Sequence, residues 1–66
     1  MRVTVNGGDR ELPDGLGLVA LLEQLGLRPG TVVVEHNGAA LVRSELDGVV
    51  LADGDRLELV RAVAGG

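Results

Sequence analysis

Four leucines at helical spacing constrain the fold of this chain more than any other feature. Positions i, i+3, i+4 and i+7 are filled by Leu18, Leu21, Leu22 and Leu25, which places all four on one face of a helix. A glycine stands at each end of the segment. The first is tolerated as an N-cap, although Ser or Thr would be stronger, and the second is typical of the residue just past a helix. The leucine face needs an apolar surface to cover it, and the rest of the chain must supply that surface.

Short runs of β-branched and alternating residues predict strands on both sides of the helix. The expected strands span residues 2–6, 10–12, 31–37, 39–42, 49–51 and 56–60. Their expected core-facing residues are Val3, Val5, Val32, Val34, Leu57 and Leu59. We expect hairpin turns at Asn6-Gly7-Gly8-Asp9 and Asn37-Gly38, a tight turn at Asp53-Gly54-Asp55, and an irregular connector over residues 43–48.

Together these elements predict one α+β domain, in which a mixed sheet of four or five strands carries a single helix on one face. The first and last strands can lie side by side and parallel. Phe, Trp and Tyr are absent, so the core must consist of Val, Leu and Ala. Residues 61–66, which end in Gly65-Gly66, are expected to form a mobile C-terminal tail.

Composition argues against several classes of partner and site. The formal net charge is −4 and aromatic residues are absent, which disfavours nucleic acids and anionic membranes. Without cysteine the chain has no side-chain thiol to carry sulfur or bind zinc, and without lysine it cannot build isopeptide-linked chains. No signal peptide or membrane-spanning run is apparent, so we expect a cytoplasmic protein that is monomeric by itself.

The side chains that could suggest catalysis are better explained by structure. His36 is the only histidine and has no cysteine or second histidine with which to bind a metal, so a solvated or hydrogen-bonded ring at a strand end is favoured. The carboxylates of Asp53 and Asp55 are favoured as turn residues that bond the local backbone. Ser44 has no base placed beside it by the sequence pattern, and Gly7-Gly8 lacks the residues of a phosphate loop. We therefore expect no catalytic side chain and no metal site.

One apolar group is expected on the outer face of the sheet. Val33, Val60 and Ala62 alternate away from the core positions of their segments. Scattered exposed valines are common on monomeric proteins. The same residues could equally dock a partner beside the C-terminal tail, and the sequence leaves both readings open.

Several segments resemble the sulfur-carrier protein of thiamin biosynthesis, the ThiS family, which has the ubiquitin-like β-grasp fold. The resemblance covers nearly the whole chain, and a Gly-Gly end on so short a domain is its most specific part. It rests on Leu21-Leu22-Glu23-Gln24-Leu25, Glu35-His36-Asn37-Gly38, Arg43-Ser44-Glu45, Asp53-Gly54-Asp55-Arg56-Leu57-Glu58-Leu59 and Arg61-Ala62-Val63-Ala64-Gly65-Gly66.

The resemblance implies that the chain is a protein co-substrate and not an enzyme. A ThiF-like enzyme would use Mg-ATP, which the carrier itself does not bind, to adenylate the carboxylate of Gly66. A cysteine desulfurase would supply sulfur to form a thiocarboxylate, and a ThiG-like thiazole synthase would take that sulfur into the thiazole ring. Val63, Ala64 and Gly65 would thread into the partner's active site.

Other functions stay open at this point. Carriers of the same fold deliver sulfur to molybdopterin or to transfer-RNA thiolation, and the shorter length here favours thiazole. A different class of function is a ubiquitin-like protein tag or a small binding module. A tag would form adducts with lysines of its targets, whereas a binding module would still work without Gly66.

Overall fold

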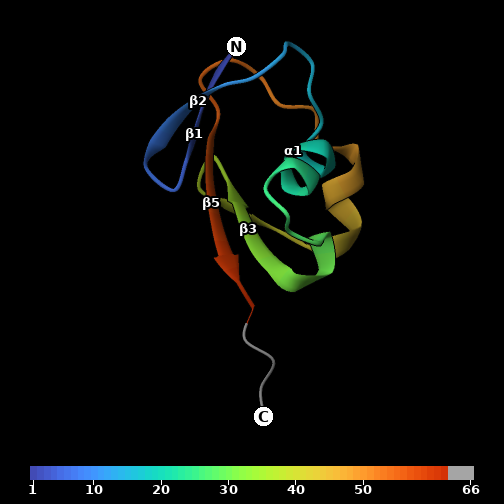
Figure 1. Cartoon of the computed structure of the whole chain (residues 1–66). Coiled ribbons are helices and arrows are strands. Elements are labelled where there is room, and N and C mark those ends of the chain that lie inside the picture. The colour runs from blue at the N-terminus through green and yellow to red at the C-terminus, as the bar shows by residue number, and fades with distance from the viewer. Residues whose placement is uncertain (63–66) are drawn as a thin grey trace.

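The structure is a computed structural model, and it describes residues 1–62. A five-stranded sheet carries one α-helix on one face, in the arrangement predicted from the sequence (Figure 1). The elements are β1 (Arg2–Val5), β2 (Gly8–Glu11), α1 (Leu18–Gln24), β3 (Val32–His36), β4 (Ala39–Leu41) and β5 (Arg56–Arg61), with 3-10 turns η1 (Pro29–Thr31) and η2 (Arg43–Gly48). This is the ubiquitin-like β-grasp, as expected.

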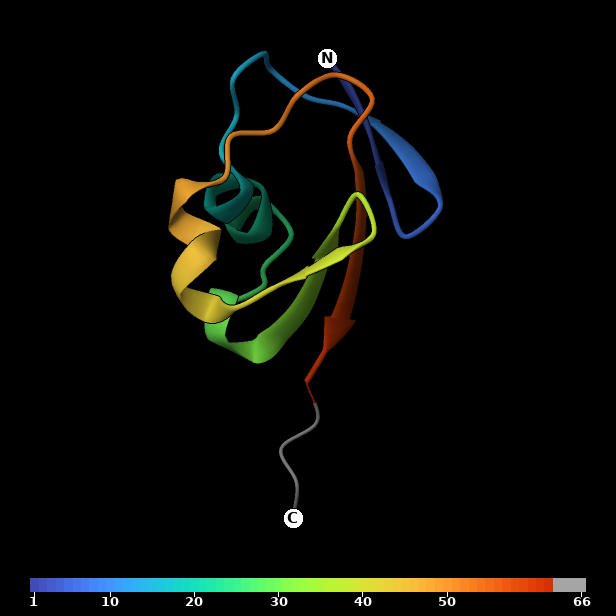
Figure 2. The ribbon, with the colours of Figure 1, turned by 180° about the vertical axis from the view of Figure 1, so that it is seen from behind.

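The sheet has the strand order β2-β1-β5-β3-β4. The first and last strands are parallel neighbours through Thr4–Arg56 and Val5–Leu57, and the other neighbouring strands are antiparallel. The last strand therefore lies in the middle of the sheet, where β3 pairs with it through Arg61 and β1 pairs only with its first two residues. Figure 2 shows the opposite side, where η2 lies beside α1 on the same side of the sheet.

The leucine stripe of α1 forms the centre of the core. Leu18, Leu21 and Leu22 are fully buried, whereas Leu25 is only partly buried at the C-terminal end. Gly17 has the extended conformation of an N-cap, and the residue after Leu25 has φ +74°. Each fully buried leucine stabilises the fold by about 1.5–3 kcal/mol relative to an exposed one.

The core-facing pattern of the strands is confirmed with one gradation. Val3, Val34 and Leu57 are buried, and Leu59 is nearly so. Val5 and Val32 are partly buried and pack against the core from its edge. The core-facing residues are therefore less completely buried toward the C-terminal end of β5, where a groove lies beside Val32.

The asparagine–glycine turns form as predicted. Asn6 and Gly7 have φ values of 49° and 84°, and Asn37 and Gly38 have 52° and 85°. Positive φ at both central residues gives a two-residue turn whose twist matches that of the strands. The first hairpin is tighter than expected, because Gly8 and the residue after it already belong to β2.

Three segments differ from the sequence-based expectation. Residues 49–51 form no strand of the sheet; Val50 makes only an isolated bridge to Gly17, because the segment bonds the stretch before α1. The connector over residues 43–48 coils into η2 and buries Leu46. Arg61, which we placed in the tail, is the last residue of β5 and pairs with Val32.

Candidate functional site

The candidate site is the C-terminal end of β5, where the chain leaves the sheet. The N terminus and this end of β5 lie at opposite ends of the molecule (Figure 1). Ala62 is still hydrogen-bonded to the segment before β3, because its backbone N–H donates to the Thr31 carbonyl at 2.8 Å. The predicted site residues Val63, Ala64, Gly65 and Gly66 lie outside the described residues, so the structure tests only the surface from which they continue.

The outer face of the sheet carries the predicted apolar group at this end. Val33 and Val60 stand directly opposite each other in β3 and β5, and they are 50% and 62% exposed. Ala62 follows two residues later and is also exposed. The structure thus pairs Val33 with Val60 at the surface, whereas Ala62 also lines a hollow on the helix side. The role of the three residues in docking stays a prediction.

Two carboxylates stand next to this apolar group. Glu35 and Glu58 form the neighbouring cross-strand pair of β3 and β5, and both are exposed. Like charges directly opposite each other in a sheet are destabilising. The outer face at this end therefore presents valines bordered by negative charge.

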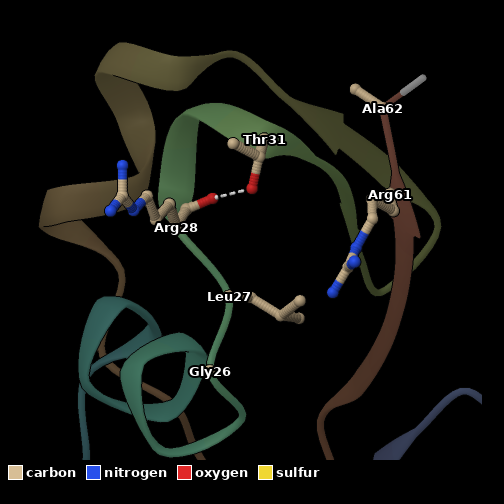
Figure 3. Close-up of a pocket in the computed structure, with 6 residues that line it drawn as sticks. All are labelled: Gly26, Leu27, Arg28, Thr31, Arg61 and Ala62. Carbon is tan, nitrogen blue, oxygen red and sulfur yellow. Dashed lines mark hydrogen bonds between the residues drawn. The ribbon is translucent and has the colours of Figure 1, made fainter. Parts of the chain in front are cut away.

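The inner face at the same end has the opposite charge. A groove between the end of α1 and the sheet is lined by Asn6, Arg10 and Arg61, with an apolar floor of Leu25, Leu27, Val5, Val32 and Leu59. A shallower hollow adjoins it, and Figure 3 shows the Arg61 side chain directed toward Leu27 there. Within residues 1–62, neither guanidinium has a carboxylate within ion-pair distance.

Hydrogen bonds fix the η1 turn that forms one side of the adjoining hollow. Thr31 Oγ1 donates to the Arg28 carbonyl at 2.7 Å, which closes the η1 turn beside Ala62 (Figure 3). The same Thr31 carbonyl accepts from Ala62, so the end of β5 is tied to η1. The position at which the chain leaves the sheet is therefore set by hydrogen bonds.

His36 and Asp55 lie at the other end of β5 and form a structural network. The His36 Nε2–H donates to Asp55 Oδ2 at 2.9 Å, and Asn37 Nδ2 donates to Asp55 Oδ1 at 3.1 Å. The Ala52 N–H also donates to this carboxylate, at 2.9 Å. Burial by itself would raise the pKa of the Asp55 carboxyl, but the three hydrogen bonds outweigh it and lower the pKa below its usual value.

Of the remaining chemical candidates, Asp53 bonds backbone as expected, but that of a residue distant in sequence and not that of its own turn. Asp53 accepts the Arg2 backbone N–H at 2.7 Å, and the Gly54 turn has φ +87°. Ser44 lies exposed in η2, on the helix side of the sheet. Across residues 1–62, no three His, Cys, Asp or Glu side chains come together as a metal site. In the same range no helix is both long enough and apolar enough to span a membrane.

Comparison with known proteins assigns the chain to a family. The ThiS family matches residues 3–66, which includes the end of β5 and the Gly-Gly terminus. The chain belongs to the ThiS family.

Solved structures agree with this ThiS membership. The crystal structure of the thiamine biosynthesis protein ThiS from Geobacter metallireducens has 33% sequence identity and a TM-score of 0.84, with both chains covered completely. A solution NMR structure of a thiamine biosynthesis protein from the same organism has 33% identity and a TM-score of 0.80, covering this chain fully and 88% of the other.

A longer relative also contains a ThiS-like segment. A protein from Paramagnetospirillum magneticum named thiazole synthase is 35% identical over 66 residues. This chain spans only 20% of that protein's length.

Two features of this ThiS-family surface were missed from the sequence. Arg61 follows Leu57 and Leu59 at the same two-residue step, so its inward direction could have been recognised from the alternation. The groove itself could not, because Arg10 and Leu27 reach it from distant parts of the chain.

Proposed function

We propose that this ThiS-family chain is a sulfur carrier of thiamin thiazole biosynthesis, and that its reactive group is the carboxylate of Gly66. The observation that carries the proposal is the family match, which continues to the last residue of the chain. A thiamine biosynthesis protein of the same length and fold supports the same pathway. The absence of cysteine supports a role for the terminal carboxylate in place of a thiol.

The proposed chemistry makes a poor electrophile reactive. A free carboxylate resists attack because an oxide-like group would have to leave. Attack of a Gly66 carboxylate oxygen on the α-phosphorus of ATP expels pyrophosphate and gives an acyl-adenylate, from which AMP can leave. The terminal sulfur of a desulfurase persulfide then attacks the carbonyl carbon and expels AMP, which gives an acyl disulfide. A further thiol attacks the desulfurase sulfur of this disulfide, so that the thiocarboxylate leaves and the two thiols end as a disulfide. ATP and Mg²⁺ belong to the ThiF-like activating enzyme in this scheme, and the carrier holds no cofactor.

The carrier supplies position, and its partners supply catalysis. Gly66 has no Cβ to obstruct the carbonyl carbon, and Gly65 allows backbone conformations that other residues avoid. Five extended residues reach about 16–18 Å, enough for Gly66 to enter an active site while the folded domain stays outside. Val33, Val60 and Ala62 would then contact the rim of the partner.

A ThiG-like thiazole synthase is the proposed acceptor of the sulfur. Support comes from the Paramagnetospirillum protein, in which a segment like this chain is part of a longer protein named thiazole synthase. Joining a carrier and its enzyme in one chain raises the effective concentration of the carrier at that enzyme.

Intact-mass analysis tests the proposal. Incubation with ATP, Mg²⁺, a ThiF-like enzyme, cysteine and a cysteine desulfurase should exchange one oxygen of the chain for sulfur, and fragmentation should place the sulfur on Gly66. A thiazole synthase should consume the product, while a molybdopterin synthase large subunit should not. Unchanged mass, or sulfur on an internal residue, would refute the carrier function; consumption by the molybdopterin enzyme alone would reassign the pathway.

A further inference from the structure

One edge of β5 is open at its C-terminal end. On the β3 side, the strand is bonded from the Asn37 N–H to Arg56 O at one end and from the Ala62 N–H to Thr31 O at the other. On the β1 side, Thr4 N–H bonds Asp55 O and Asn6 N–H bonds Leu57 O. Main-chain groups alternate between the two edges of a strand, so those of Arg61 face the β1 side.

The Asn6 side chain marks where pairing with β1 ends. Its Oδ1 accepts the Leu59 N–H at 2.7 Å, and its Nδ2 donates to the Leu59 carbonyl at 3.2 Å. The Asn6 carboxamide thus bonds the main-chain groups of Leu59 where another residue of β1 would otherwise pair. The main chain of β1 turns away from β5 at Gly7. Beyond it, no part of residues 1–62 pairs with Arg61 on this side, and Figure 1 shows the β1–β2 hairpin ending short of the end of β5.

This open edge borders the arginine groove. Asn6, Arg10 and Arg61 line the groove above an apolar floor, and no described carboxylate neutralises either guanidinium. An unpaired strand edge is a template for another extended chain. Two guanidinium groups beside it would bind a carboxylate, and Arg is suited to bidentate carboxylate contacts.

The geometry points to strand addition at Arg61 by the activating enzyme. We infer that an extended segment of that enzyme pairs with the main-chain N–H and C=O of Arg61, and that an Asp or Glu side chain of the segment lies between Arg10 and Arg61. This inference rests on the proposed function, since it concerns the partner that receives Gly66. Pairing five residues before the reacting carboxylate would fix the direction of the chain toward ATP, and such orientation contributes strongly to rate.

Amide exchange provides the direct test. In the free chain, NMR should show rapid solvent exchange for the Arg61 N–H and for the Glu11 N–H, which faces the open edge of β2. A saturating amount of the activating enzyme should slow the Arg61 amide by about tenfold or more, the effect of one added hydrogen bond. The Glu11 amide should keep its rate. An unchanged Arg61 amide in the complex would overturn the inference.

Charge variants test the acidic contact. Arg61→Gln and Arg10→Gln together should weaken binding to the activating enzyme by about tenfold or more, while Arg43→Gln, an exposed arginine of η2, should not. Equal losses from Arg43→Gln would show a general charge effect and overturn the contact. An ester in place of the Val60–Arg61 amide should weaken binding and lower the thermal midpoint only slightly, because that N–H has no partner in the described fold and the Val60 carbonyl, which faces β3, becomes a somewhat weaker acceptor.

The remaining outcomes separate this inference from the proposed function. Protection of Arg61 that depends on chain concentration without enzyme would assign the edge to a second copy and overturn the inference. Normal oxygen-for-sulfur exchange at Gly66 with an unprotected Arg61 would refute strand addition alone. Failure of the unsubstituted chain to exchange oxygen for sulfur would refute the sulfur-carrier function instead.

Discussion

The two ends of β5 differ in how completely they are bonded, although they belong to one six-residue strand. At the N-terminal end, β1 and β3 bond the strand on both sides, and the Asp55 carboxylate accepts three hydrogen bonds. At the C-terminal end, Arg61 pairs with β3 alone and has no described ion pair. The bonded end stabilises the fold, while the open end leaves main-chain and charged groups available to a partner.

This contrast suggests that stability and carrier function can be separated along the length of one strand. Substitutions near the bonded end and the core should change the free energy of unfolding and spare the chemistry. Substitutions near the open end should spare unfolding and change the encounter with partners. The predictions below test that separation, beginning with the largest effect.

Leu22→Ala should lower the free energy of unfolding by about 2–5 kcal/mol, because a fully buried leucine leaves a cavity in the core. Leu25→Ala should cost less, since Leu25 is only partly buried. Chemical denaturation of both variants measures the difference. A loss for Leu22→Ala below about half a kilocalorie would place the core elsewhere.

Asp55→Asn should lower the free energy of unfolding near pH 7 by about 1–3 kcal/mol, because the charged acceptor of three hydrogen bonds is replaced. The folded pKa of Asp55 lies below the unfolded value of 3.8. Its contribution is therefore complete above that value and is lost as the pH falls through the folded pKa.

The pH series has a matched control and a clear contrary result. The stability difference between the parent and Asp55→Asn should be constant above about pH 5 and should shrink below about pH 4. Asp47→Asn, at an exposed aspartate of η2, should give a small difference at every pH. A parent–Asp55→Asn difference that grows on acidification would reverse the sign assigned to the network.

Val60→Asp should leave the chain folded and lower the free energy of unfolding by no more than about 1 kcal/mol, because the side chain is 62% exposed but Asp is disfavoured in a strand beside Glu35 and Glu58. It should weaken binding to the activating enzyme by about tenfold, since a charge would be desolvated at the interface. Val50→Asp is the matched control, because Val50 is 65% exposed at a distant bridge to Gly17. Equal affinities of both variants in calorimetric titration would remove the outer face from docking.

Features of the fold that depend on residues near in sequence were easier to predict than those that depend on distant contacts. The leucine stripe and the asparagine–glycine turns were predicted from local patterns, and the parallel pairing of the terminal strands was predicted from the order of the elements. Residues 49–51 could not, because their partner is the stretch before α1 and not a strand. The two hydrogen bonds between the Asn6 side chain and the Leu59 backbone join residues 53 apart in sequence, and no local rule predicts them.

The candidate site was predicted in part. Alternation along β3 and β5 placed Val33 and Val60 on the outer face, and the structure confirms that position. The tail boundary at residue 61 was wrong, because the main-chain bonding of β3 and η1 continues through Arg61 and Ala62. Small residues near the end of a chain suggested an early end of the strand, whereas its length is set by the partner strand.

Deletion of Gly66 tests the separation of stability from chemistry most directly. Intact mass after incubation with ATP, Mg²⁺, activating enzyme and sulfur source should show complete conversion of the parent chain to the thiocarboxylate and none of the shortened chain. The shortened chain should keep the thermal midpoint of the parent, since the core and the hydrogen-bond network around Asp55 consist of residues that the deletion leaves in place. His36→Ala, at the other end of β5, should lower the midpoint and still be converted. Conversion of the chain that lacks Gly66 would contradict the assignment of the chemistry to the terminal carboxylate.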